Sequence, residues 1–277
     1  MKKLSLFITS IVISGLIFQA CQKDENEAIA TTKVPQQVID KIANMGFNPD
    51  GIEAVEEGYR IERDIIITHD ILEHTPSDHR VPFMEQYRTT NLVSSNGNRV
   101  ITIYAPVGGR KGYSAGMIAG LDLAIARYND QNLTISFQRV TNSGGADIVM
   151  TRLNKGDERR GILGSAGFPT ASGDPYNEIK MSGILESTYG LSTGGIATII
   201  AHEMGHCVGL RHTDYFDRSI SCGGGTSNEG DGGVGAIHIP NTPTGASLSA
   251  QSYMLSCTDG GDRPFNNDDK TALDFLY

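Results

Sequence analysis

The chain has 277 residues, a formal net charge of −9 and 39% hydrophobic residues, a composition ordinary for a globular protein. No run of basic residues occurs beyond the N-terminus, so nucleic acid is excluded as the expected partner. The 33 glycines indicate many tight turns rather than disorder.

Residues 1–20 have the pattern of a secretion signal, in which two lysines precede an apolar stretch too short to be read as a membrane span. Cys21 follows directly, so either it is lipidated after cleavage by a lipoprotein signal peptidase, or an ordinary cleavage leaves a thiol near the new terminus. Phe18 is bulky for the small-residue site of ordinary cleavage. The polar residues 22–26 resemble the acidic tether that follows the lipid cysteine in bacterial surface lipoproteins. We therefore expect an exported protein, an outer-membrane or cell-surface lipoprotein in preference to a freely secreted one, with its lipid as the sole membrane contact.

Residues 21–34 are predicted to carry this lipid and form a polar tether, and residues 35–85 to form a small N-terminal or pro-segment region. A short helix is expected at the start of this region, because apolar residues recur there at helical spacing. Residues 58–68 are predicted to form one strand with three consecutive isoleucines at its core. Residues 70–87 are charged and contain proline, which is typical of an exposed linker.

Residues 86–277 alternate strand and helix patterns, as expected of an α/β domain. One long helix has an apolar stripe at helical spacing. A second begins near Ser192 or Thr193, because either residue is a good N-cap before an apolar run. In chain order we predict strands at 100–104, 133–137, 146–150, 161–168 and 178–184, with helices at 114–129, from 192 or 193 onward, and at 267–277.

The second long helix contains the pattern HExxHxxGxxH over residues 202–212. Because His202 and His206 are four residues apart, both rings lie on one face of a helix and can reach a single zinc ion. Gly209 can take the left-handed conformation that turns the chain back, so that His212 supplies a third nitrogen. Three protein ligands leave a coordination position for water, as in catalytic zinc sites. Glu203 can touch that water without binding the metal and is expected to be the general base.

Three cysteines follow Cys21, and the sequence leaves all three pairings open. The preferred pair, Cys222 with Cys257, would tie the loop after the zinc helix to the segment around Met254. Cys207 is then a small buried residue on the helix. Export makes such a disulfide chemically permissible.

The order of elements and the third histidine of the zinc motif resemble the metzincin metallopeptidases. That resemblance implies a twisted, mostly parallel five-stranded sheet with an antiparallel edge strand, two long helices including the zinc helix, and an irregular C-terminal subdomain with a final helix. It also implies a methionine in a tight turn beneath the metal, for which Met254 is well placed. The edge strand near residues 161–168 is expected to pair with an extended substrate by strand addition.

Residues 86–277 are more closely similar to the bacterial dual-action HEIGH metallopeptidases. The resemblance implies an endopeptidase that uses one zinc ion and acts on protein or peptide substrates, and we expect a monomer. Residues 228–233 offer oxygens for calcium, but their spacing does not support a calcium site. Met204 stands where the family usually has isoleucine. The resemblance is carried by residues 86–93 (QYRTTNLV), 202–215 (HEMGHCVGLRHTDY), 221–224 (SCGG), 228–230 (NEG), 237–240 (IHIP) and 263–266 (RPFN).

Residues 60–65 (RIERDI) resemble the pro-segment motif by which astacin-like metzincins place an aspartate on the zinc. The aspartate would be Asp64, while Ile61 and Arg63 replace the aromatic residue and the glycine of that motif. A plain strand with solvated charges is the preferred interpretation, because acidic residues on strand surfaces are usually exposed.

Two other interpretations remain. In the first, Glu229 replaces His212 as third ligand, as in thermolysin-like peptidases. In the second, the chain is a lipid-anchored binding module or adhesin whose zinc site is not catalytic. Glu203 argues against the second, since a structural zinc needs no positioned base.

Overall fold

The computed structural model describes residues 33–45, 47, 49–74, 86–109, 111–225, 228–229, 235–243, 246 and 251–277. The expected signal, Cys21 and the tether up to residue 32 lie outside these residues, as does most of the glycine-rich stretch considered for calcium. None of the helices in the described part has both the length and the apolar character needed to cross a bilayer.

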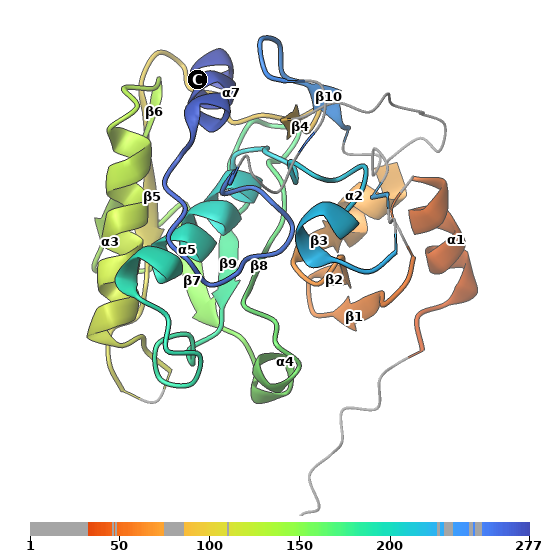
Figure 1. Cartoon of the computed structure of the whole chain (residues 1–277), viewed down its shortest axis with the longest axis horizontal. Coiled ribbons are helices and arrows are strands. Elements are labelled where there is room, and N and C mark those ends of the chain that lie inside the picture. Colours follow the sequence, from red (N-terminus) through yellow and green to blue (C-terminus); the bar gives the residue numbers. More distant parts are fainter. Residues whose placement is uncertain are drawn as a thin grey trace, which may run out of the picture. The chain divides into compact units, whose positions relative to one another are not determined.

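A mostly parallel sheet forms the centre of the unit Lys33–Tyr277, as the sequence predicts (Figure 1). Four of its strands run parallel, and β8 runs antiparallel to β9. The order across this part of the sheet is β8-β9-β7-β5-β6. The strands are β5 (Arg99–Tyr104), β6 (Ile135–Val140), β7 (Ile148–Arg152), β8 (Gly164–Ala166) and β9 (Glu178–Met181).

Two long helices pack against this sheet and against each other, α3 (Ala115–Asn129) and α5 (Thr193–Cys207). Each begins at a serine whose hydroxyl accepts a hydrogen bond from a backbone amide in the first turn, Ser114 from Met117 and Ser192 from Gly195. The helices approach closely at Gly120, where any larger side chain would collide with Ile196. Every residue of α5 from Gly195 to Cys207 is buried, so the helix that carries the histidines is a rigid part of the core.

The N-terminal region extends the sheet, which therefore has eight strands among the described residues instead of five. The prediction of one strand over residues 58–68 is wrong. The chain turns back at Glu62 and Arg63, whose φ values of 54° and 82° lie in the left-handed region, and β2 and β3 form an antiparallel hairpin. The hairpin packs beneath α1, so this region has a small core of its own. Its elements are α1 (Gln36–Asn44), β1 (Glu53–Val55), β2 (Gly58–Ile61), β3 (Ile65–Thr68) and α2 (His69–His74).

Strand β3 runs parallel to β8, with Ile65 opposite Ala166. The backbone amide of Ala166 also donates a hydrogen bond to the carbonyl of Asp64, at 2.9 Å. The expectation that β8 is a free edge strand is therefore wrong for this form of the chain. The position expected for a substrate is occupied by the hairpin β2–β3.

The chain beyond His212 is irregular, as expected, and closes with α7 (Asn267–Leu276). Asn266 and Asp269 form a capping box at the start of that helix. A short helix, α6 (Ser219–Cys222), follows the zinc motif. The remaining elements are α4 (Lys155–Arg159) and the two-stranded sheet of β4 (Tyr87–Arg88) and β10 (Ile237–His238).

Candidate metal centre

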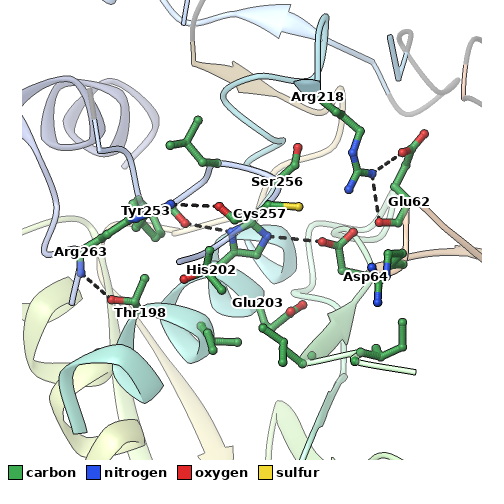
Figure 2. Close-up of a pocket in the computed structure, with 18 residues that line it drawn as sticks. Glu62, Asp64, Thr198, His202, Glu203, Arg218, Tyr253, Ser256, Cys257 and Arg263 are labelled. Atoms are coloured by element: carbon green, nitrogen blue, oxygen red, sulfur yellow. Dashed lines mark hydrogen bonds and ion pairs between the residues drawn. The ribbon is translucent and has the colours of Figure 1, made fainter. Parts of the chain in front are cut away.

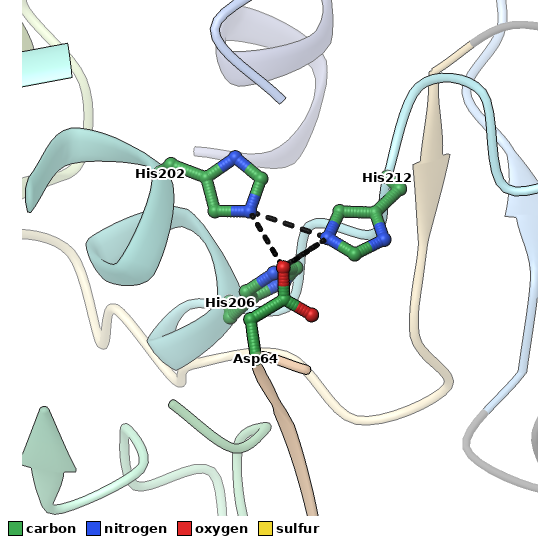
Figure 3. A group of neighbouring side chains, drawn as sticks. All are labelled: Asp64, His202, His206 and His212. Carbon is green, nitrogen blue, oxygen red and sulfur yellow. Dashed lines mark hydrogen bonds and ion pairs between the residues drawn. The ribbon is translucent and has the colours of Figure 1, made fainter. Parts of the chain in front are cut away.

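The three histidines of the motif converge on one point (Figure 3). Nε2 of His212 lies 3.2 Å from Nε2 of His202 and 3.2 Å from Nε2 of His206. His202 and His206 come from the last two turns of α5. His212 returns to them because the chain turns at Gly209, whose φ is 101°.

The other nitrogen of each ring is held by an acceptor. Nδ1 of His202 faces the carbonyl oxygen of Tyr253 at 2.9 Å, and Nδ1 of His206 faces that of Leu210 at 2.9 Å. Nδ1 of His212 faces Oε1 of Glu229 at 2.6 Å. An acceptor at Nδ1 favours the neutral tautomer with its proton there, which directs the lone pair of Nε2 towards the shared point whenever the ring is neutral.

Three lone pairs that face one another repel unless a cation lies between them. A tetrahedral zinc ion with Zn–N bonds of about 2.0–2.1 Å separates its nitrogens by roughly 3.3 Å, close to the observed spacing. Burial lowers the pKa of His202 to about 4. At His212 burial is outweighed by Glu229 and Asp64, which raise the pKa to about 10. The carboxylates thus favour a positive charge among the rings, which a zinc ion would supply.

Glu203 lines the same pocket as His202 and has a buried carboxylate. The side chain is only 2% exposed, and its Oε2 has no hydrogen-bond partner among the described residues. Burial, with the negative charge of Asp64, raises its pKa well above the usual value. Gly164 of β8 passes so close that any larger side chain there would collide with the carboxylate. A buried, unpartnered carboxylate beside a metal position is suited to exchange a proton with a bound water.

Met254 is completely buried. A Cβ on Gly205 would lie 2.6 Å from its sulfur, so the thioether packs directly on the zinc helix between the two ligand turns. The same turn presents the carbonyl of Tyr253 to His202. The hydroxyl of Tyr253 forms a hydrogen bond with that of Tyr128 in the core, at 3.0 Å.

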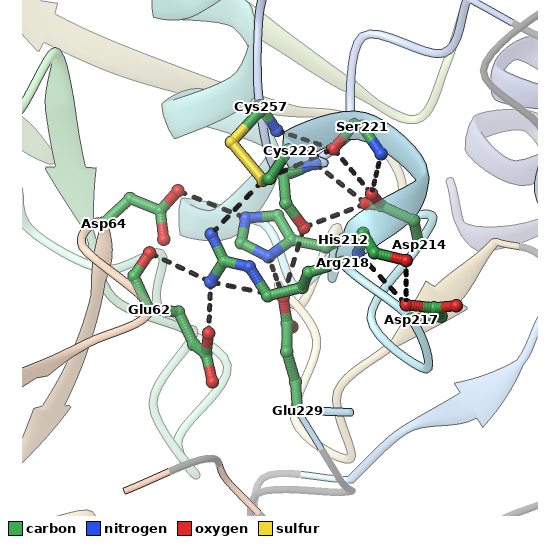
Figure 4. The surroundings of a disulfide bond; sticks show 12 residues. Glu62, Asp64, His212, Asp214, Asp217, Arg218, Ser221, Cys222, Glu229 and Cys257 are labelled. Atoms are coloured by element: carbon green, nitrogen blue, oxygen red, sulfur yellow. Dashed lines mark hydrogen bonds and ion pairs between the residues drawn. A yellow bond between two sulfur atoms is a disulfide. The ribbon is translucent and has the colours of Figure 1, made fainter. Parts of the chain in front are cut away.

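Asp214 joins the segments on the far side of His212 (Figure 4). Its Oδ1 accepts hydrogen bonds from the amide and hydroxyl of Ser256, both at 2.9 Å, and its Oδ2 accepts from the hydroxyl of Ser221 at 2.6 Å. Cys222 and Cys257 form a disulfide beside these contacts, and Cys207 is a free, buried thiol. The loop after the zinc helix is thereby tied to the turn that contains Met254.

Asp64 lies within the same cluster, at the tip of the hairpin. Its Oδ2 is 3.4 Å from Nε2 of His212 and 4.0 Å from Nε2 of His202. The preferred expectation of solvated charges in this segment is wrong, because Arg60 is only 3% and Glu62 only 7% exposed. The hairpin tip therefore brings a carboxylate oxygen into the same group of possible metal ligands as the three rings.

Glu229 has a role that differs from the one considered for it. It contacts Nδ1 of His212, the nitrogen that faces away from the other rings, and therefore supports a ligand instead of replacing it. The motif itself holds no signal for this contact, since the two residues are 17 positions apart across a glycine-rich loop. Arg218, which contacts both Glu62 and Glu229, is a second residue of the site that the pattern does not reveal.

Three converging imidazole nitrogens beside a buried carboxylate define the site of a metallopeptidase. The chain belongs to the family of dual-action HEIGH metallo-peptidases, whose model matches residues 59–277. The resemblance found in the sequence is thus confirmed, and the protein is a zinc metallopeptidase. The match begins within β2, so it includes the hairpin tip as well as the histidines.

Several solved structures are similar to the chain, and no curated protein matches it. A structure of myroilysin has 15% identity and a TM-score of 0.41, and covers 68% of this chain and 96% of that one. A crystal structure of myroilysin has 16% identity, a TM-score of 0.39 and coverages of 68% and 86%. The GM1-bound form of the ECX AB5 holotoxin has 17% identity, a TM-score of 0.36 and coverages of 68% and 81%.

Proposed function

We propose that the protein is an exported zinc endopeptidase in which His202, His206 and His212 hold the metal and Glu203 is the general base. The single observation that carries this proposal is the buried carboxylate of Glu203, whose Oε2 has no hydrogen-bond partner in the part of the chain that the structure describes, beside three converging imidazole nitrogens. A binding module would have no use for a buried carboxylate kept without a partner, because such a group destabilises the fold.

A zinc ion bound there would supply the positive charge that acidifies a water molecule and polarises the scissile carbonyl. The chain's own residues do the remaining work. Glu203 takes a proton as the peptide bond is attacked and gives it to the leaving amine. Glu229 and the carbonyls of Tyr253 and Leu210 orient the rings, and Met254 closes the site from below.

We further propose that the full-length chain is latent. Asp64 would take the fourth position on the metal, while β3 covers β8. Two consecutive non-glycine residues with positive φ, Glu62 and Arg63, each cost on the order of 1–2 kcal/mol. Such a turn persists where its surroundings hold it in place, which supports an interaction that the hairpin tip is built to make. Removal of the N-terminal region would then expose the site.

The test of the endopeptidase is Glu203→Gln in the full-length chain, assayed on denatured casein after activation by limited proteolysis. We expect the variant to bind zinc as the wild type does and to lose about 10²- to 10⁴-fold in activity. Glu186→Gln changes an exposed glutamate and is the matched control. A zinc-loaded wild type that cleaves nothing would favour the binding module. A variant that still cleaves at the wild-type rate would show that Glu203 is not the general base.

Export and anchoring are a separate proposal. We propose that Cys21, outside the described residues, is lipidated and holds the protein at the outer membrane or cell surface. Labelled fatty acid should appear in the wild type and not in Cys21→Ser. Equal labelling of both proteins would contradict the proposal that Cys21 is lipidated, and it would not affect the proposed peptidase activity.

A further inference from the structure

The hairpin tip contacts the site through a second acidic side chain besides Asp64. Glu62 lies in the pocket that also contains His202 and Glu203, with its carboxylate against the guanidinium of Arg218 (Figure 2). Nη1 of Arg218 donates to Oε2 of Glu62 and also to the backbone carbonyl of Glu62, at 3.0 Å in the second case. The guanidinium of Arg218 therefore binds both the main chain and the side chain of Glu62.

Arg218 belongs to the segment that follows the zinc motif, and the hydrogen bond that its backbone carbonyl accepts does not involve the hairpin. It precedes α6, and its carbonyl accepts a hydrogen bond from the amide of Cys222 at 2.9 Å. Cys222 is in turn bonded to Cys257, and its sulfur lies 3.9 Å from Nη2 of Arg218 (Figure 4). The backbone of Arg218 is thus held by α6, next to the disulfide, through a contact that does not involve the hairpin.

Among the described residues, Glu62 is the carboxylate in closest contact with Arg218. The other carboxylate within reach, Glu229, lies 3.7 Å away and already accepts hydrogen bonds from His212 at 2.6 Å and Ser256 at 3.2 Å. Arg218 is only 8% exposed with the hairpin in place, and removal of the hairpin takes away its contacts with Glu62. A buried guanidinium that loses its best partner favours any ligand that restores a carboxylate.

Glu62 lies close in the chain to Asp64, which contacts the histidine cluster. Ile65 pairs with β8, Asp64 lies against His212, and Glu62 lies two residues further along the same backbone. A substrate that presents a peptide bond to the histidines would occupy the pocket that His202, Glu203 and Arg218 line together. One of its side chains within about three residues of that bond would then meet Arg218.

We propose that Arg218 forms a subsite that selects acidic side chains close to the scissile bond, and that Glu62 fills this subsite in the full-length chain. The substrate class is thus peptides with aspartate or glutamate near the cleaved bond. The inference rests on the proposed endopeptidase function and identifies its specificity-determining residue. Arg218 positions substrate and takes no part in bond cleavage.

The test compares cleavage sites. Full-length wild type, Arg218→Gln and Arg218→Glu are activated by limited proteolysis and given a peptide library from a digested proteome, with products read by mass spectrometry. We expect the wild type to favour Asp and Glu over Asn and Gln about tenfold or more at one position within three residues of the cleaved bond. Arg218→Gln should lose this preference, and Arg218→Glu should favour Lys and Arg at the same position.

The readout is a ratio within one digest, so it does not depend on how much of a variant folds. Arg263→Gln is the matched control, because this arginine lines the same pocket but binds Asp259 and the carbonyl of Cys257. The control should keep the wild-type ratio. Wild-type cleavage without an acidic preference, or a preference unchanged in both Arg218 variants, would overturn the inference.

A binding measurement separates this inference from the peptidase itself. Labelled peptides that copy residues 58–68, with Glu or Gln at position 62, are titrated into the activated chain and followed by anisotropy. We expect the Glu peptide to bind about tenfold more tightly than the Gln peptide, and equally once Arg218 is changed to Gln. If the protein cleaves nothing, the proposed endopeptidase function is rejected. The ratio of the two peptide affinities still tests whether Arg218 binds acidic side chains. Equal binding of both peptides to the wild type rejects it.

Discussion

The zinc motif and the N-terminal hairpin meet at one point but come from opposite kinds of sequence information. The three histidines lie within eleven consecutive positions, on one helix and the turn after it. The hairpin reaches them from far away: Glu62 and Arg218, which touch, are 156 residues apart. The first arrangement follows from local geometry, whereas the second exists only once β3 has joined β8. The zinc motif is thus readable from spacing alone, whereas the contact of Asp64 with His212, which residues 60–65 suggest by resemblance, is seen in the fold.

The largest expected effect comes from Asp64, the hairpin residue that contacts the histidines. Asp64→Ala in the full-length chain should raise proteolysis of casein on the order of 100-fold, because removing one partner of a buried charge pair costs about 3–5 kcal/mol. Glu73→Ala, an exposed glutamate of the same N-terminal region, should leave the chain latent. If Asp64→Ala and wild type are equally inactive until cleaved by another protease, the carboxylate is not what blocks the site.

Removal of the disulfide tests whether the irregular segment after His212, like the hairpin, is stabilised by contacts between residues far apart in the sequence. Cys222 and Cys257 are 35 residues apart, and closing a loop of that length stabilises the fold by about 3–4 kcal/mol in the chain-entropy model. The double change to serine should lower the free energy of unfolding by about this amount in urea titrations of the otherwise intact chain. Cys207→Ser is not a control, since that thiol is buried in α5. Comparison with reduced wild type serves instead, and a difference between the two would show that the serines themselves matter.

Glu229 sharpens the comparison, because it supports a ligand of the local motif from outside the motif. Glu229→Gln removes the charge that holds Nδ1 of His212 while keeping the shape. We expect zinc affinity to fall about 10- to 100-fold, measured by competition with a chelator. Loss of all zinc would mean that Glu229 is itself a ligand, and unchanged affinity would mean that His212 is oriented by its surroundings alone.

The smallest effect concerns the N-cap of the zinc helix. Ser192→Ala removes the acceptor of the Gly195 amide, and should cost about 1 kcal/mol in thermal or urea unfolding. Ser192→Asp keeps an acceptor and should restore most of the loss. If both variants unfold like the wild type, the helix is held by its buried face and the cap contributes nothing measurable.

The long elements were predictable because their patterns are local. Helix 114–129 and the helix from Ser192 appear within one residue of their expected starts, since cap and apolar stripe coincide. The strand predicted over 58–68 failed because its turn uses Glu62 and Arg63 in a conformation that usually signals itself through glycine or asparagine. The ionic contacts of Asp64, Glu62 and Glu229 depend on which distant segments meet, and no periodicity in the chain encodes that.

A zinc-bound crystal structure of the full-length chain would test the central claim most directly. The account predicts one zinc ion at about 2.0–2.1 Å from Nε2 of His202, His206 and His212, with a carboxylate oxygen of Asp64 as the fourth ligand. An ion held by Glu229, or a fourth position open to solvent while the hairpin is still in place, would contradict it.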